Sequence, residues 1–151
     1  MSIHITTPDL TQAVQNALER LVSSCAPDQP NLYPCPRLVS CDGPSLTIEL
    51  EHDTKPWMAN PMGIVHGGVL ATILDNAMGI TCRCLYNHFC PTISMNVTYS
   101  RPVPISETIR LRVEVILAGS TTAQLQALIY LPSQPNRILV SATGVYCSQA
   151  K

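Results

Sequence analysis

The sequence predicts an α+β protein in which an antiparallel sheet of about six strands surrounds one central helix, with an extra helix at the N-terminus. Three observations lead to this prediction. An apolar segment with helical spacing lies near the middle of the chain, four strand-like segments follow it, and two more precede it. Strands that follow one another closely are joined by hairpins, which makes the sheet mostly antiparallel. A chain of 151 residues is expected to form a single domain with a sizeable core.

The first element is an amphipathic helix within residues 1–26. Leu10, Val14 and Leu18 recur at helical spacing, and Thr7 and Pro8 suit the N-cap and the first helical position. A proline-rich connector, APDQPNLYPCP, follows and cannot form regular structure. The core of the domain is expected to span residues 35–148.

Six strands and one further helix are expected in that core. Two short strands in RLVSCDGPSLTIELE turn at Asp42-Gly43, and a helix runs from about Gly67 to Leu85. The segments TISMNVTYS, TIRLRVEVIL, TTAQLQALIYL and RILVSATGVYC supply the other four strands. Gly119 and the stretch Pro132–Pro135 supply turns between them.

Charge and composition exclude several classes of partner. The net charge of −1 argues against nucleic acid as the main partner. The sequence contains no run of 18 apolar residues, so we expect no membrane span. Residues 1–75 carry three basic and eight acidic side chains, whereas residues 76–151 carry six basic and two acidic ones. The second half could present a modest cationic surface to a phosphorylated ligand, or the charges are simply solvated. The N-terminus lacks the features of a signal peptide, which favours a cytoplasmic protein.

Seven cysteines, none of them in a Cys-x-x-Cys pair, fit reduced thiols in that compartment. Cys82, Cys84, His88 and Cys90 offer enough side chains for a zinc site. If the helix continues through Cys84, however, Cys82 and Cys84 point about 200° apart and cannot chelate one ion. We therefore expect small buried thiols and no metal.

The predicted central helix contains a carboxylate in apolar surroundings. Asp75 and Asn76 are the only strongly polar residues between Gly68 and Thr81, and apolar side chains nearly surround the helix axis. A carboxylate in such a place must be paired or hydrogen-bonded. Perturbed carboxylates cluster at functional sites, although Asp75 could also accept bonds from a neighbouring turn.

His66-Gly67-Gly68 stands at the start of this helix. Glycines there let a substrate approach the backbone, and the first N–H groups of a helix, at its positive dipole end, can stabilise an oxyanion. The alternatives are a tight turn for the glycines, an N-cap for His66, and a turn residue for Asn60, which lies six residues upstream.

The run Asn60…Gly63…His66-Gly67-Gly68…Asp75 resembles the signature of hotdog-fold acyl-CoA thioesterases, in the branch of the phenylacetate-pathway and Arthrobacter-type 4-hydroxybenzoyl-CoA thioesterases. TISMNVTYSRPV is similar to the strand that follows the helix in that family. The resemblance implies hydrolysis of acyl-CoA or acyl-carrier-protein thioesters without a cofactor. A thioester has a good leaving group, so a carboxylate and an oxyanion-stabilising dipole suffice, and no Gly-x-Ser-x-Gly elbow is present.

The resemblance also implies roles for individual residues. Asp75 would act as nucleophile or as general base on water, and the Gly67 N–H would polarise the thioester carbonyl. Asn60 would hold the lytic water or the carbonyl, and His66 would orient the loop. Thr92 is the best match to an assisting hydroxyl, with Ser94 next. The residues expected to contact substrate are Gly68, Ser94 and Arg101, the last as one of four candidates for phosphate contact with Arg110, Arg112 and Arg137.

Gly67 and Asp75 are eight residues apart, or about 12 Å along a helix axis. One thioester carbon cannot contact both in the same chain, so two copies must share a site. This fits the antiparallel pairing of central helices in the family, and a homodimer at least, or a homotetramer, is expected. Two other functions stay open: a hotdog hydratase-dehydratase acting on enoyl or hydroxyacyl thioesters, and a non-catalytic acyl-thioester binding protein.

Overall fold

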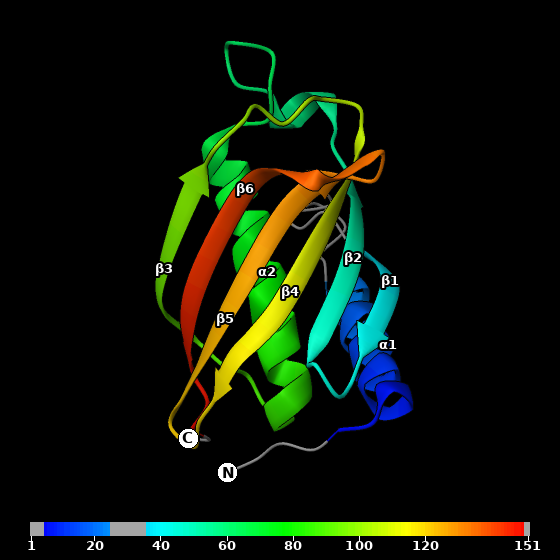
Figure 1. The fold of residues 1–151 in the computed structure, drawn as a ribbon, viewed down its shortest axis with the longest axis vertical. Coiled ribbons are helices and arrows are strands. Elements are labelled where there is room, and N and C mark those ends of the chain that lie inside the picture. Colours follow the sequence, from blue (N-terminus) through cyan, green and yellow to red (C-terminus); the bar gives the residue numbers. More distant parts are fainter. Residues whose placement is uncertain (1–4, 25–35, 150–151) are drawn as a thin grey trace.

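A computed structural model describes residues 5–24 and 36–149. It contains two α-helices, a short 3₁₀ helix and six strands (Figure 1). In chain order these are α1 (Thr7–Ser24), β1 (Arg37–Asp42), β2 (Thr47–Asp53), η1 (Pro56–Met58), α2 (Gly67–Tyr86), β3 (Thr92–Tyr99), β4 (Thr108–Ala118), β5 (Thr122–Leu131) and β6 (Gln134–Cys147). The strands form one sheet in the order β1-β2-β4-β5-β6-β3, and every neighbouring pair is antiparallel.

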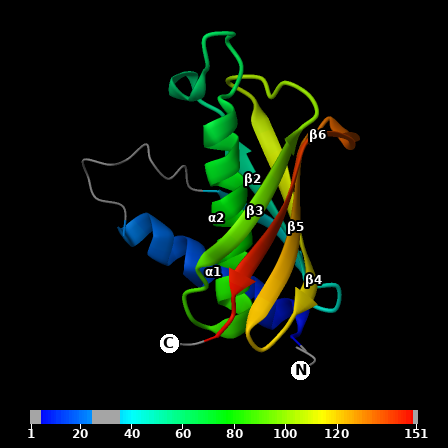
Figure 2. The same cartoon turned by 90° about the vertical axis from the view of Figure 1, so that its left-hand side faces the viewer.

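The sheet curves around α2, which lies along its concave face, while α1 packs on α2 next to β1 (Figures 1 and 2). This arrangement confirms the predicted hotdog fold. Among the described strands, β3 pairs only with β6 and lies at one edge of the sheet. No helix within the described ranges is long and apolar enough to cross a membrane.

One hydrophobic cluster joins both helices to the sheet. α2 contributes buried side chains from three successive turns, including Leu70, Leu74 and Met78, to a cluster that also contains core residues of β2, β4, β5 and β6. The partly buried Met95 and Val97 of β3 pack against this cluster. Leu10 and Val14 of α1 are completely buried in the same cluster, as their helical spacing predicts. Burial of apolar side chains in such a cluster is the main source of stability in a small domain.

The docking of α1 depends on a close backbone contact at the β1–β2 turn. A Cβ on Gly43 would lie 2.5 Å from the carbonyl oxygen of Ile5, and the N–H of Gly43 donates to the Thr7 hydroxyl over 3.0 Å. Thr6, rather than Thr7, caps the helix, because its hydroxyl oxygen accepts from the N–H of Asp9. The predicted cap was therefore wrong by one residue.

The other predicted elements agree with the structure within a few residues. α2 ends at Tyr86, one residue beyond the predicted end, and Asn87 closes it in the left-handed conformation with φ of 56°. β6 begins at Gln134, so only residues 132–133 form the predicted Pro132–Pro135 turn, and Pro135 is part of the strand. The proline-rich connector falls almost entirely outside the described residues.

Candidate active site

A small hairpin precedes α2 and carries Asn60. The N–H of Asn60 donates to the carbonyl of Ile64 (2.8 Å), and the N–H of Gly63 donates to the carbonyl of Asn60 (2.9 Å). Gly63 has a φ of +75°, a conformation that favours glycine. The hairpin ends where the N–H of His66 donates to the carbonyl of Met58 (2.8 Å). These bonds place Asn60 in the loop that leads directly into α2.

The side chain of Asn60 helps to shape this loop. Its Oδ1 accepts from the N–H of Met62 over 2.9 Å and from that of Ile64 over 3.3 Å. The turn role that sequence alone left open is thus present in the structure. Since Oδ1 is occupied by the loop, the amide NH₂ group is the part of the half-buried side chain left to contact a substrate.

His66 is the N-cap of α2. Its Nδ1 accepts from the N–H of Gly68 over 2.9 Å, and its carbonyl accepts from the N–H groups of Val69 and Leu70. A Cβ on Gly68 would lie 3.2 Å from that same Nδ1, so glycine lets the imidazole fold over the helix end. Because Nδ1 is an acceptor, the neutral ring carries its proton on the exposed Nε2.

Gly67 therefore holds the one N–H group of the first turn that has no recorded acceptor among the described residues. This N–H lies at the positive end of the helix dipole. The hydroxyl of Tyr99 donates to the carbonyl of Gly67 over 2.8 Å, and a Cβ on Gly67 would lie 3.3 Å from the Tyr99 ring. The Gly68 N–H, by contrast, is already used by His66.

Asp75 lies two turns further along α2 and is held by two hydroxyl groups. Thr92, at the start of β3, donates to Asp75 Oδ1 over 2.8 Å, and Tyr146, near the end of β6, donates to the same oxygen over 2.8 Å. Both donors act on Oδ1, so Oδ2 is the carboxylate oxygen without a recorded donor in the described structure. Asp75 is half-buried, and Thr92 is exposed on the edge strand.

Sequence analysis missed Tyr146. This side chain is fully buried under α2, and its ring fits because residue 144 is glycine: a Cβ there would lie 2.7 Å from the ring. Burial, together with the nearby Asp75 carboxylate, raises the pKa of Tyr146, which keeps the phenol protonated as a donor. A buried tyrosine needs a partner for its hydroxyl. The alternating burial of the last strand predicts that Tyr146 faces the core, but it does not identify Asp75 as the partner of its hydroxyl.

The structure brings Thr92 to Asp75 but not Ser94. Thr92 pairs with Tyr146 on the face toward α2, whereas Ser94 pairs with Val145, on the opposite face, because the β3–β6 register shifts between residues 92 and 94. Ser94 instead lines a hollow on the outer face of the sheet with Gln124, Gln126 and Thr143.

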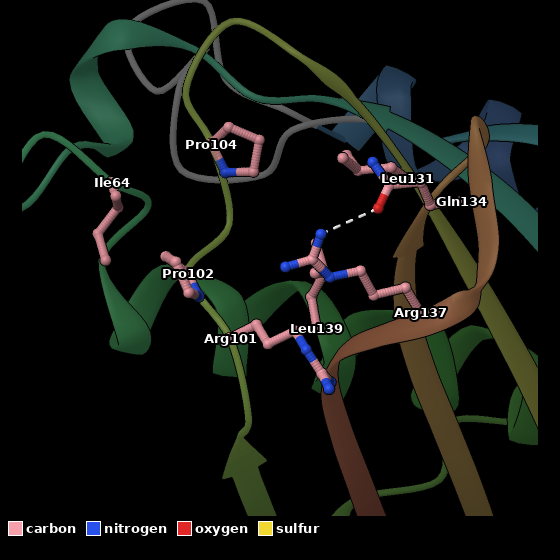
Figure 3. A pocket seen from close by; sticks show the side chains of 8 residues that line it. All are labelled: Ile64, Arg101, Pro102, Pro104, Leu131, Gln134, Arg137 and Leu139. Carbon is pink, nitrogen blue, oxygen red and sulfur yellow. Dashed lines mark hydrogen bonds between the residues drawn. The ribbon is translucent and has the colours of Figure 1, made fainter.

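The four arginine candidates divide into two kinds. Arg110 and Arg112 on the outer face of the sheet form ion pairs with Glu49 and Glu51. Arg101 and Arg137 line a pocket between the segment after β3 and the β5–β6 turn (Figure 3). Arg101 donates to the carbonyl of Ile138 over 2.7 Å.

Cys82 and Cys84 have different neighbours, as their positions on a helix predict. Cys82 lies next to Cys90, whereas Cys84 lies near Cys41 and has a pKa raised to about 12, chiefly by burial. His88 bonds to backbone carbonyls of Phe89 and Ser148. No three metal-binding side chains gather at one point in the parts of the chain described.

Comparison with known proteins identifies relatives of this chain. The family model described as "Thioesterase superfamily" matches residues 62–136, a range that includes His66-Gly67-Gly68, Asp75 and Thr92. The human protein acyl-coenzyme A thioesterase 13 is 32% identical over 90 residues, which are 58% of this chain and 57% of the human protein. The match thus spans little more than half the length of that relative.

Two solved structures share the fold. The E. coli PaaI protein from the phenylacetic acid degradation operon superposes with a TM-score of 0.74 at 16% identity, over 91% of this chain and 94% of the other. A Streptococcus mutans protein bound to acetyl-CoA superposes with a TM-score of 0.66 at 17% identity, over 74% of this chain and 86% of the other.

Proposed function

Because this chain belongs to the thioesterase superfamily, we propose that it hydrolyses acyl-CoA thioesters to a free acid and a thiol. The observation that carries the proposal is the Asp75 carboxylate, which two hydroxyl groups hold by one oxygen on a largely apolar helix. A carboxylate held in this way is oriented and keeps its second oxygen available for chemistry.

The proposed reaction needs only groups of the protein and water. In its general-base form, Asp75 Oδ2 removes a proton from a water molecule as the water oxygen bonds to the thioester carbon. The Gly67 N–H stabilises the negative charge on the carbonyl oxygen, and the Asn60 NH₂ group supplies a further donor. The C–S bond then breaks, and the proton passes to the leaving thiolate. In its nucleophilic form, Oδ2 attacks the carbon, the C–S bond breaks and the thiolate leaves, so that a mixed anhydride forms on Asp75. Water then hydrolyses the anhydride, which releases the acid and restores the Asp75 carboxylate, and a proton from the water passes to the thiolate.

We propose that two copies of the chain share each site. α2 is one continuous helix, so about 12 Å separates Gly67 from Asp75 in the same chain. Asp75 lies beside Thr92 on β3, one of the two edge strands of the described sheet, and Ile93 and Tyr99 on that strand are about half exposed or more (57% and 50%). An open edge with exposed apolar side chains favours pairing with another chain. This supports a dimer in which Asp75 of one chain faces Gly67 and Asn60 of the other.

The remaining predicted residues take supporting roles in this proposal. Thr92 orients Asp75, and His66 fixes the helix start so that the Gly67 N–H points outward. Gly68 accommodates the imidazole and does not itself bind substrate. Ser94 lies on the other face of the sheet and has no part in the reaction we propose.

The test is release of thiol from a panel of aromatic, short, medium and long acyl-CoAs, compared with Asp75→Asn. Phenylacetyl-CoA belongs in the panel because a structural neighbour comes from a phenylacetic acid degradation operon. We expect at least one substrate to be hydrolysed by the wild type and not by the variant. An enoyl-CoA absorbance assay tests the hydratase alternative, and binding of acyl-CoA without thiol release would indicate a non-catalytic binding protein.

Two further proposals concern the compartment and the domain organisation of the chain. We propose the cytoplasm as the compartment, since the five described cysteines are free thiols, as a reducing environment maintains. We also propose that residues 1–151 act as one domain, with the helix in 1–26 and the catalytic core in 35–148. The hydrophobic cluster shared by α1, α2 and the sheet supports this.

A further inference from the structure

The first turn of α2 contains two adjacent glycines, Gly67 and Gly68. Neither accepts a Cβ without displacing a side chain: one on Gly67 would lie 3.3 Å from the Tyr99 ring, and one on Gly68 would lie 3.2 Å from Nδ1 of His66. Glycine loses more conformational freedom on folding than any other residue, and only proline favours a helix less. The turn that presents the Gly67 N–H therefore depends on contacts from outside the helix to stay in place.

Tyr99, the last residue of β3, supplies such a contact. Its hydroxyl donates to the carbonyl of Gly67 over 2.8 Å. Among the described residues, no other hydrogen bond joins the first turn of α2 to the sheet. The bonds made by His66 hold the same turn from the side of the loop. Tyr99 thus connects the helix start to a second, separate element.

The backbone around Tyr99 is itself held by the sheet. Tyr99 pairs with Val140 of β6, which is completely buried. The next two N–H groups, of Ser100 and Arg101, both donate to the carbonyl of Leu139. The phenol is half exposed (50%), so its hydroxyl bond, rather than deep burial, fixes its orientation. A side chain supported in this way can serve as a fixed point for the helix start.

The same strand also holds the proposed catalytic carboxylate. Thr92, the first residue of β3, donates to Asp75. Tyr99, the last residue, donates to Gly67. β3 runs beside α2 in both views of the fold (Figures 1 and 2). One strand therefore fixes both the carboxylate and the N-terminus of α2 relative to the edge of the sheet.

We propose that Tyr99 is a positioning residue for the oxyanion site: its hydroxyl holds the first turn of α2 so that the Gly67 N–H stays directed at the thioester carbonyl. The inference rests on the proposed thioesterase function. Tyr99 does not contact the reacting atoms and acts through the backbone of Gly67. An oxyanion donor matters most in the transition state, because negative charge develops on the oxygen only during the reaction. Loss of the Tyr99 hydroxyl therefore lowers kcat and leaves KM little changed.

The kinetic test compares Tyr99→Phe with Tyr86→Phe. Tyr86, in the last turn of α2, donates to the carbonyl of Gly119 over 2.8 Å, so this control removes a bond of the same kind and length from the other end of the helix. Tyr99→Phe keeps the ring against Gly67, and water can replace the lost donor, so we expect it to fold. A hydrogen bond between neutral groups is worth about a twofold to tenfold effect. We expect kcat for thiol release to fall by about that factor in Tyr99→Phe only.

A spectroscopic measurement tests the positioning without any turnover. With ¹⁵N in glycine and ¹³C in the carbonyl of histidine, the Gly67 amide is identified directly, because His66-Gly67 is the only His-Gly pair in the sequence. A rigid backbone amide has an order parameter of about 0.85. We expect the Gly67 order parameter to fall in Tyr99→Phe and to match the wild type in Tyr86→Phe.

Several results would overturn the proposal. They are an unchanged Gly67 order parameter or an unchanged kcat in Tyr99→Phe, a higher KM at constant kcat, and an equal loss of kcat in Tyr86→Phe. If the wild type hydrolyses no thioester, the proposed function fails, and the Gly67 amide still decides whether Tyr99 positions the helix start.

Discussion

Tyr146 donates its phenolic hydrogen to Oδ1 of Asp75 over 2.8 Å, from a side chain that is completely buried beneath the central helix. The same hydroxyl also approaches the backbone carbonyl of Asp75 at 3.2 Å. A phenol with two acceptors on one residue restricts both the position of the helix turn and the rotation of the carboxylate. Thr92 adds a second donor to Oδ1, so Oδ2 is the oxygen that takes part in the reaction we propose.

Replacing Asp75 with Asn should abolish most of the activity. The substitution keeps the size of the side chain but removes the base or nucleophile, and positioned general-base catalysis is worth about 10²–10⁴ in rate. We expect kcat for thiol release to fall by at least that factor, with an unchanged circular dichroism spectrum. Near-normal turnover by a folded Asp75→Asn protein would exclude a catalytic carboxylate.

Replacing Tyr146 with Phe should lower kcat for thiol release. The hydroxyls of Tyr146 and Thr92 both donate to Asp75 Oδ1, so loss of one donor leaves the carboxylate less firmly oriented for the reaction. A hydrogen bond to a charged group contributes about 1.5–3 kcal/mol, which corresponds to about a tenfold to hundredfold change in rate. We expect kcat to fall by up to about that factor, with KM little changed.

Tyr130→Phe is the matched control for this variant. Tyr130 is also buried, but its hydroxyl donates to Glu49 on the outer face of the sheet over 2.6 Å. We expect Tyr130→Phe to leave kcat unchanged. If both phenylalanine variants lose stability alike and neither lowers kcat, Tyr146 has only a packing role.

Hydrolysis should proceed without added metal and should be unaffected by a chelator. Cys82 and Cys84, the two cysteines closest in sequence, have different neighbours, and the proposed chemistry uses only Asp75 and backbone or amide donors. The measurement is thiol release before and after dialysis against EDTA. Activity that is lost to EDTA and restored by zinc would show that Cys82, Cys84, His88 and Cys90 had been misjudged.

Glu49 should contribute to stability in a pH-dependent way. Burial alone would raise the pKa of its carboxyl group, but hydrogen bonds from Tyr130 and Arg112 outweigh this effect and lower it. Its contribution is therefore complete above the unfolded pKa of about 4.3 and is lost as the pH falls through the folded value. At pH 7, Glu49→Gln should unfold at a lower urea concentration than the wild type. We expect its free energy of unfolding to be lower by about 1 kcal/mol, because the ion pair is partly exposed.

The difference between wild type and Glu49→Gln should shrink between pH 5 and pH 3, because the wild-type carboxylate then becomes protonated as well. Glu19→Gln on the exposed side of α1 is the control and should match the wild type at every pH. A stability difference that stays constant down to pH 3 would show that Glu49 acts through packing and not through its charge.

Local patterns predicted the helices well, because helical spacing of apolar residues is visible in a short window. They also located Asp75 and His66-Gly67-Gly68 on one helix, which fixes their separation. Contacts between strands were harder to predict, since they depend on the register of pairs distant in sequence. The partnership of Tyr146 with Asp75 joins residues 71 positions apart.

The choice between Thr92 and Ser94 shows the same limit at closer range. Residues two apart on a regular strand point to the same face, so the sequence offers no reason to separate these two hydroxyls. The register shift between them turns Ser94 away from α2 and leaves Thr92 beside Asp75. The ion pairs that occupy Arg110 and Arg112 likewise depend on the pairing of β2 with β4, which the local sequence does not specify.

We propose that Asp75 of one chain acts on a thioester held by Asn60 and Gly67 of a second copy, and mixing two inactive variants tests whether the two chains share a site. Asn60→Asp suits this purpose because it keeps the Oδ1 acceptor for the loop, while it replaces the NH₂ donors with an oxygen that repels the oxyanion. Homodimers of Asn60→Asp and of Asp75→Ala should each be nearly inactive.

The measurement is thiol release after the two variants are unfolded together and refolded at equal concentration. By random pairing about half of the dimers are mixed, and each mixed dimer has one site with both lesions and one intact site. The account predicts return of about a quarter of wild-type activity if sites act independently. If a single chain supplied all site residues, every site would carry one lesion. No return of activity, with mixed dimers confirmed by native mass spectrometry, would contradict the shared site.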